Sequence, residues 1–274
     1  MSQPLVLYSY RYSVYCWIAR LTLAEKRLSY AVLEINPFTE DQVHTRFERT
    51  PFGLVPVLKQ GAFTLYESAA ICRYIDLSFP DPALVPKEPM AAAQMAQAIN
   101  IIDNYGYRPM IRQVFAHQVF RPIEGLEASN DEIASGIAAS APVLKALEPL
   151  CGHGFARLGG QKTLADCHLA PMFGYFSQAE EGAKMLASYP KLAQWCAQLK
   201  DWSSYRDTEP KFVAAGAPKS PRRELPHHRS PAPLHARPRN RWDVHGRSWP
   251  DLRQRRQTPL PHRPHGLNRP LLVR

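Results

Sequence analysis

This sequence lacks paired cysteines, metal-ligand patterns and long apolar runs, each of which would indicate a particular class of protein. Its five cysteines are widely spaced and form neither a CxxC pair nor a Cys/His ligand pattern, which argues against a disulfide framework and a zinc site. No apolar run approaches the roughly 18 residues of a membrane span, and no secretion signal opens the chain. We therefore expect free thiols in a reducing compartment, the cytoplasm, with no metal and no membrane contact.

The excess of positive charge comes from one end of the chain. The 274 residues have a formal net charge of +10, but residues 1–217 hold 20 Lys and Arg against 21 Asp and Glu. Residues 218–274 hold 14 against 3, together with 11 Pro and 6 His. We predict that residues 216–274 form a disordered basic tail, because they have few apolar residues and no periodicity. A frameshift near codon 214 would also give this composition. Nucleic acid would bind only through this tail.

The first 80 residues alternate strand and helix patterns. The expected strands begin at residues 5, 30, 55 and 63, and the expected helices cover residues 14–28 and 69–77. This β-α-β, β-β-α order predicts an α/β thioredoxin-like N-terminal domain over residues 1–80.

Strand patterns are missing after a Pro-rich linker at residues 81–89. The expected helices cover residues 90–120, with an interruption or kink at Pro109, then 131–150 and 189–199. Thr163 and Asp166 form a capping-box pattern ahead of another apolar run. Residues 90–215 are therefore predicted to be an all-α C-terminal bundle.

Two short segments of the first domain together suggest a ligand. Pro56 has no N–H for a ladder, so the segment from Gly53 to Leu58 is expected at a sheet edge or bulge, where its backbone can pair with an extended ligand. Ser68 is expected to be the N-cap of the next helix, whose start can bind an anion, while Glu67 can bind an ammonium group. An extended peptide with a zwitterionic end, such as glutathione, fits both segments.

These segments resemble those of the cytosolic glutathione transferases. The resemblance covers residues 4–212 and rests on the motifs at residues 50–58, 65–71 and 163–166. It implies glutathione as co-substrate, a homodimer, and a cis Val55–Pro56 bond. It also implies that Val55 pairs with the cysteinyl unit and that Glu67 and Ser68 bind the γ-glutamyl group. The residues from Ser13 to Cys16 are most similar to the serine-type classes, phi and theta among them.

Three side chains are candidates for the group that acts on the glutathione thiol. Ser13 lies at the start of the first helix and matches the catalytic serine in the resemblance, although it could also be only an N-cap. Tyr8 is the rival, since other classes use a tyrosine from the end of the first strand, but we expect the strand to bury it. Cys16 could form mixed disulfides, yet a buried structural thiol is the better interpretation.

The sequence indicates less clearly which residues bind the glycine end of glutathione and which bind the electrophile. Leu54 and Pro56 are assigned to the glutathione site with Val55, although Leu54 stands where related classes have a polar residue. The glycine end of glutathione is assigned to Gln42, with His44 and Arg46 as alternatives. The electrophile pocket is assigned to Tyr12, Tyr107 and Ile111, although such a stripe is also typical of core packing. The other members of this expected wall are Tyr10, Arg11 and Phe115.

The sequence therefore predicts a glutathione transferase that attacks a small apolar electrophile with the glutathione thiolate. Two alternatives remain open: a non-catalytic binding or assembly module of the same fold whose tail contacts RNA or another acidic partner, and a glutathione-dependent isomerase or dehalogenase.

Overall fold

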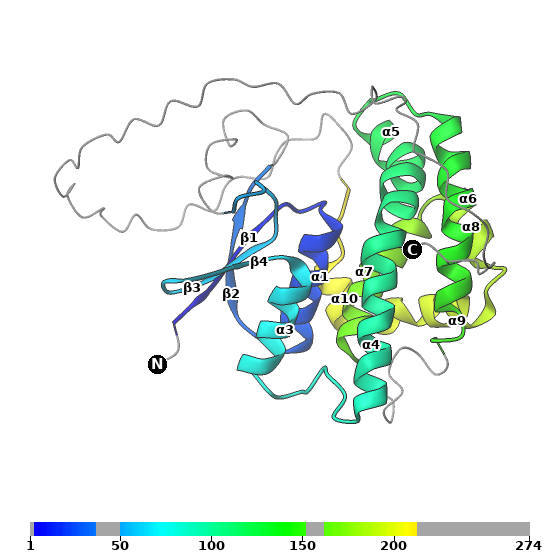
Figure 1. Cartoon of the computed structure of the whole chain (residues 1–274). Coiled ribbons are helices and arrows are strands. Elements are labelled where there is room, and N and C mark those ends of the chain that lie inside the picture. Colours follow the sequence, from blue (N-terminus) through cyan, green and yellow to red (C-terminus); the bar gives the residue numbers. More distant parts are fainter. Residues whose placement is uncertain (1–2, 37–49, 152–161, 213–274) are drawn as a thin grey trace, which may run out of the picture. The chain divides into compact units, whose positions relative to one another are not determined.

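The computed structural model describes residues 3–36, 50–151 and 162–212 (Figure 1). All of these described residues belong to one compact unit. The predictions for Gln42, His44 and Arg46 and for the tail at 216–274 lie outside the described residues.

A four-stranded sheet forms the N-terminal part, in the order β2-β1-β3-β4. Its strands are β1 (Leu5–Ser9), β2 (Tyr30–Glu34), β3 (Val57–Gln60) and β4 (Phe63–Tyr66). Strands β1 and β2 run parallel, as a β-α-β unit requires, while β3 is antiparallel to both β1 and β4. The predicted thioredoxin-like domain is confirmed.

Helices α1 (Val14–Glu25) and α3 (Ser68–Ser78) pack on one face of this sheet. Leu7 and Leu58, which are neighbours across the β1–β3 ladder, join Leu23, Ile71 and Ile75 in a common core. Helix α1 ends three residues before the predicted end, because Arg27 adopts the left-handed conformation with φ of 54° and the Leu28 N–H bonds back to the Leu23 carbonyl.

The rest of the described chain is helical, as predicted. The helices are α4 (Pro89–Ile101), η2 (Ile102–Phe120), α5 (Arg121–Ile123), α6 (Asn130–Leu147), α7 (Leu164–Phe176), α8 (Glu180–Leu186), α9 (Pro190–Gln198), η3 (Leu199–Asp201) and α10 (Ser203–Thr208). Helices α8 and α10 were not predicted, because each is too short to show a period.

Pro109 does not end the helix in which it lies. The chain runs from α4 through η2 to α5 without a break, and η2 has the i→i+5 spacing of a π-helix over its whole length. The predicted interruption at Pro109 is therefore wrong, and the change in helical spacing begins seven residues earlier, at Ile102. Proline removes one backbone donor, and a wider helical turn is one arrangement that accommodates such a loss.

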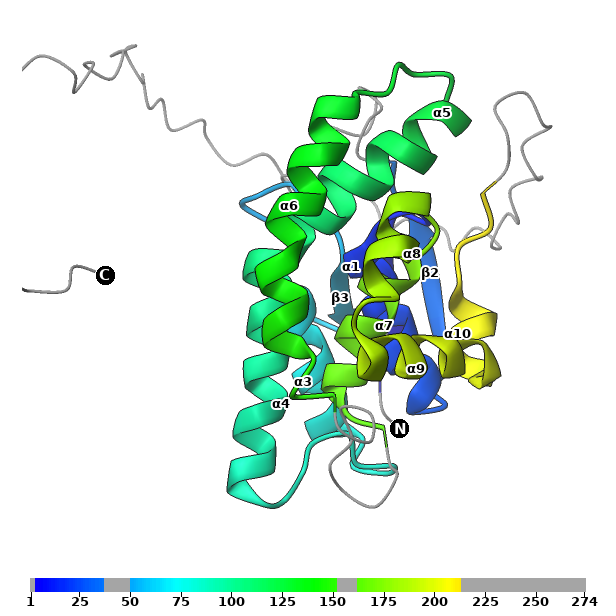
Figure 2. The ribbon, with the colours of Figure 1, turned by 90° about the vertical axis from the view of Figure 1, so that its right-hand side faces the viewer.

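Helix α7 is the centre of the helical part (Figure 2). All thirteen of its residues are buried, and the predicted capping box is present, with the Thr163 N–H donating to Asp166 Oδ2 at 2.7 Å. The other oxygen of Asp166 accepts a bond from Trp195 Nε1 at 3.1 Å, which ties α7 to α9. Helix α7 also packs on α1, so a single core includes residues from both parts of the chain.

No helix among the described residues is long and apolar enough to cross a membrane. Within the same residues, no three His, Cys, Asp or Glu side chains lie close enough together to hold a metal ion.

Candidate active site

The register of the sheet brings the predicted site segments to one end of the domain. Tyr8 pairs with Val57, and Val57 pairs with Tyr66, so the three residues form one row across β1, β3 and β4. The chain that follows Tyr8 leads to Ser13, the chain that precedes Val57 contains Val55 and Pro56, and the chain that follows Tyr66 is Glu67–Ser68. These segments therefore all continue past this row at the same end of the sheet.

Ser13 is the N-cap of α1, the structural role that the sequence left open for it beside the catalytic one. Its backbone is extended, with φ of −71° and ψ of 124°, and its Oγ accepts a hydrogen bond from the Cys16 N–H at 3.3 Å. Serine is favoured at this position because its short side chain can satisfy a free N–H of the first turn. A hydroxyl has one donor besides its acceptor sites, so the Ser13 proton can still be donated to another group.

The two rivals of Ser13 differ in burial. Tyr8 is half-buried, not buried as predicted, because it points away from the face on which Leu7 and Ser9 are covered. Cys16 is fully buried, and its Sγ accepts a bond from the Tyr10 N–H at 3.3 Å. Burial raises the pKa of the Cys16 thiol. Cys16 is therefore a structural thiol, as predicted, and a poor nucleophile.

The Val55–Pro56 peptide bond is cis, as the family resemblance implies. The predicted position of this segment at a sheet edge is wrong. Strand β3 is an interior strand that begins at Val57, so Pro56 precedes the ladder and its missing N–H costs no pairing. Val55 is half-buried outside the strand, while the side chain of Leu54 is 63% exposed.

Helix α3 begins one residue earlier than predicted. Ser68 is its first helical residue and is 8% exposed, and Glu67 takes the N-cap position. The prediction that Ser68 is the N-cap is therefore wrong. Glu67 has a φ of 71°, a left-handed conformation that is costly for a residue other than glycine. This backbone turns the chain out of β4 and aligns the first turn of α3.

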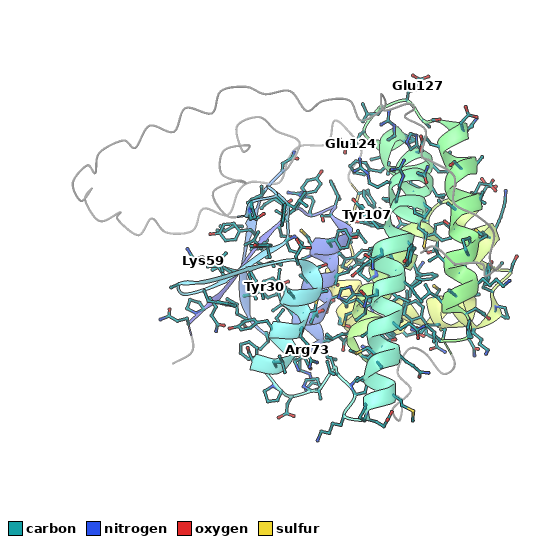
Figure 3. The ribbon with its side chains drawn as sticks, in the orientation of Figure 1. Tyr30, Lys59, Arg73, Tyr107, Glu124 and Glu127 are labelled. Carbon is teal, nitrogen blue, oxygen red and sulfur yellow. The ribbon has the colours of Figure 1, made fainter. Side chains whose placement is uncertain are left out.

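Negative charge gathers beside the start of α1. Tyr15 lies two residues after Ser13, and burial raises its pKa, with further increases from the charges of Asp103 and Glu67. The centroid of the Tyr15 ring lies 4.9 Å from that of the Tyr107 ring on η2. Figure 3 shows Tyr107 on the side of η2 that faces the N-terminal part. The beginnings of α1, α3 and η2 therefore lie close together.

The residues predicted for the electrophile pocket lie in three environments. Tyr107 packs on Tyr15, Tyr12 stacks on Phe212 with ring centroids 5.0 Å apart, and Ile111 is 7% exposed within the core. The burial of Ile111 fits the alternative interpretation of this stripe as core packing. The assignment of Tyr12, Tyr107 and Ile111 to one electrophile pocket stays a prediction.

An aromatic cluster next to Ser13 includes two residues that the sequence analysis missed. The Phe212 ring contacts the rings of Tyr12, Phe115 and Phe120. The Tyr175 ring stacks on that of Phe115, with the ring centroids 4.3 Å apart. Phe212 follows the last helix in a stretch without periodicity, so no local signal marks it. Tyr175 lies inside an apolar run, where it is indistinguishable from an ordinary core residue.

Known proteins share both the sequence and the fold. Residues 7–83 match the family model of the glutathione S-transferase N-terminal domain. The chain is 32% identical over 174 residues to glutathione S-transferase Z2 of Arabidopsis thaliana, covering 61% of this chain and 74% of the relative. It is 24% identical over 211 residues to probable maleylacetoacetate isomerase 1 of Drosophila melanogaster, covering 75% and 81%.

A solved structure extends the likeness to the fold. A glutathione S-transferase of Methylobacterium radiotolerans in complex with glutathione sulfonate has a TM-score of 0.61 and 25% identity, over 76% of this chain and 95% of that chain. By its sequence and its fold, the chain belongs to the glutathione S-transferase family.

Proposed function

We propose that this protein catalyses nucleophilic attack of the glutathione thiolate on a small, apolar electrophile. The observation that carries the proposal is the row Tyr8–Val57–Tyr66, which puts the Ser13 loop, the cis Val55–Pro56 bond and the Glu67–Ser68 helix start at one end of the sheet. A ligand that is peptide along its length and zwitterionic at one end matches that arrangement.

Glutathione would be held by groups that suit each of its parts. The Val55 backbone lies outside the β3 ladder and would pair with the cysteinyl unit. The first turn of α3 offers N–H groups and a positive helix end to the γ-glutamyl carboxylate, and Glu67 would accept from the ammonium group. The glycine carboxylate is assigned to Gln42.

Ser13 would lower the pKa of the glutathione thiol by stabilising the thiolate. A free thiol titrates near 8.5, so most glutathione is protonated at neutral pH. Lowering that pKa by about 2 units requires about 2.7 kcal/mol of preferential thiolate stabilisation. A hydrogen bond from one hydroxyl, together with the positive N-terminus of α1, can supply a stabilisation free energy of this size, because hydrogen bonds to ions are strong. The aromatic cluster around Tyr12 and Phe212 would form the apolar side of the electrophile site.

The test is ionisation of bound glutathione. Added to the full-length protein at pH 6.5, glutathione should produce the ultraviolet absorbance of a thiolate, whereas S-methylglutathione should bind and produce none. Binding without any thiolate signal between pH 6 and pH 8, and without turnover of any electrophile in a panel, would contradict the proposal.

A second candidate is a glutathione-dependent isomerase, which the likeness to maleylacetoacetate isomerase 1 of Drosophila melanogaster favours. In such a reaction the thiolate adds to a carbon–carbon double bond, and the resulting single bond allows rotation. Elimination then restores the double bond and releases the glutathione thiolate. Glutathione is then not consumed, whereas a transferase consumes one molecule for each product. Counting free thiol during turnover of maleylacetoacetate and of a conjugation substrate separates the two activities.

We also propose a homodimer, as the family resemblance implies. The exposed apolar side chains Phe52, Met90 and Tyr105 are consistent with a contact surface. Sedimentation of the full-length protein tests this. The non-catalytic alternative would require salt-dependent RNA binding that is lost on truncation at Gly216, with no transferase rate.

A further inference from the structure

The loop from Tyr10 to Ser13 is held by side chains from three other elements. On its outer side, Glu34 at the end of β2 accepts from the Arg11 backbone N–H at 2.8 Å and from Arg11 Nε at 3.2 Å. Inside the loop, the Ser13 N–H donates to the Tyr10 carbonyl at 3.0 Å. These bonds define the turn between β1 and α1.

Arg20 braces the same loop from within α1. Its Nη2 donates to the Arg11 carbonyl at 3.0 Å, and its Nη1 donates to the buried Ser9 Oγ at 3.0 Å. One guanidinium therefore bridges the last residue of β1 and the loop. Arg20 lies seven residues after Ser13, two turns along the same helix, so it points back to the end that Ser13 caps.

Tyr175 braces the next peptide from the buried helix α7. Its hydroxyl donates to the Tyr12 carbonyl at 3.1 Å, and its ring is fixed by stacking on Phe115. Burial raises the pKa of Tyr175, so the hydroxyl remains a protonated donor at any physiological pH. The Tyr12 carbonyl belongs to the peptide group that carries the Ser13 nitrogen, so this bond sets the orientation of the peptide before Ser13.

We propose that Arg20 and Tyr175 are positioning residues that aim the Ser13 hydroxyl at the glutathione thiolate. The inference rests on the proposed function, in which Ser13 stabilises that thiolate. Neither side chain bonds to Ser13 in the structure; each holds the carbonyl of one of the two residues before it. Catalytic groups must be placed within a fraction of an ångström, and small displacements cost activity on the order of 10- to 100-fold.

The first test uses tyrosine variants. Tyr175→Phe removes the hydroxyl and keeps the ring, and we expect kcat to fall on the order of 10-fold with little change in the KM for glutathione. The pH at which bound thiolate forms should rise, because the donor is displaced. Tyr189→Phe is the matched control, since the Tyr189 hydroxyl also donates to a backbone carbonyl, that of Ala141 at 3.3 Å, outside the loop.

The second test uses arginine variants. Arg20→Met should lower kcat at least as much as Tyr175→Phe, and Arg20→Lys should recover part of it, because an ammonium group can still reach one of the two acceptors. Arg206→Met is the control, as the exposed Arg206 bonds only the Lys200 carbonyl in the described contacts. If Arg20→Met fails to fold, Tyr175→Phe decides alone.

The deciding measurement repeats Tyr175→Phe in a Ser13→Ala background. A residue that acts through Ser13 has little further effect once Ser13 is gone, whereas a residue that merely supports the fold lowers kcat by the same factor in both backgrounds. Equal factors, or a Tyr175→Phe enzyme identical to wild type, would overturn the inference. Absence of thiolate formation in the wild type would instead refute the proposed function on which the inference rests.

Discussion

At the scale of single residues, Ser13 has two roles that use different atoms. Its Oγ accepts the Cys16 N–H as a helix cap, and its proton is left for a ligand. Alanine at this position would therefore lose a cap as well as a donor, and the two losses have to be separated by experiment.

Ser13→Ala should reduce kcat far more than it reduces affinity for glutathione, because the hydroxyl acts on the thiolate and most binding contacts lie elsewhere. Steady-state kinetics at saturating glutathione and calorimetric binding measure the two effects.

Ser129→Ala is the matched control for the lost cap. The Ser129 side chain caps α6 by accepting from the Glu132 N–H at 3.3 Å, the same distance as in the Ser13 cap. Both variants should lose about 1 kcal/mol of stability, and only Ser13→Ala should lose turnover. Equal losses of affinity and turnover in Ser13→Ala would count against the assigned role.

At the scale of secondary-structure elements, one buried ion pair joins the end of α1 to α3. Lys26 Nζ lies 2.8 Å from Asp76 Oδ1, with the two side chains 0% and 8% exposed. Lys26 also donates to the Pro82 carbonyl at 2.6 Å, and Asp76 accepts from the Leu84 N–H at 2.8 Å. The pair thereby fixes the linker that leads to the helical part.

Asp76→Ala should cost about 3–5 kcal/mol of unfolding free energy, because it leaves the Lys26 charge buried without a partner. The double variant Lys26→Met/Asp76→Leu should cost less than Asp76→Ala alone. Urea denaturation measures both, and Glu180→Ala, which breaks an exposed pair with Lys184, should leave the midpoint unchanged. A double variant less stable than the single one would contradict this account.

Gly136 lies at the contact between α6 and η2. A Cβ at this position would come within 2.8 Å of Gln113 Cβ, the Pro109 carbonyl oxygen and Val114 Cγ2. Gly136→Ala should therefore destabilise the protein by about 1–3 kcal/mol, although alanine is the better helix former. Ser135→Ala, at an exposed position of the same helix, should change stability by no more than about 0.5 kcal/mol in thermal or urea unfolding. A stabilised Gly136→Ala variant would refute the close contact.

At the scale of the whole molecule, a buried histidine couples stability to pH. His168 of α7 has its Nδ1 3.2 Å from Asp103 Oδ2 on η2. Burial alone would lower the pKa of His168, but Asp103 and Cys72 outweigh it and raise the pKa to about 10. Since the pKa in the unfolded chain is about 6.5, this pair contributes its full stability below pH 6.5 and loses it as the pH rises through 10.

The variant Asp103→Asn should therefore be less stable than the wild type at pH 6, by a difference that shrinks toward pH 10. Unfolding free energies of both proteins from pH 6 to pH 10 measure this. The exposed Asp131→Asn should show no such trend, and a difference for Asp103→Asn that stays constant with pH would contradict the charged state of His168.

The parts of this protein that could be predicted are those with a local cause. Ser13 as a cap of α1, the capping box of Thr163 and Asp166, and the β-α-β, β-β-α order all follow from side chains within a few residues of one another. The start of α3 could not be predicted to the residue, because the left-handed backbone of Glu67 is imposed by the turn out of β4.

The sequence by itself determined which short segments can cap a helix, precede a strand or present a free donor, because those properties depend on neighbouring residues. Only the tertiary structure decided that Pro56 adjoins an interior strand, that Ile111 belongs to the core, and that Phe212 reaches Tyr12. It also decided that Arg20 and Tyr175 hold the loop before Ser13. These contacts join residues that are distant in the chain, so no local pattern in the sequence indicates them.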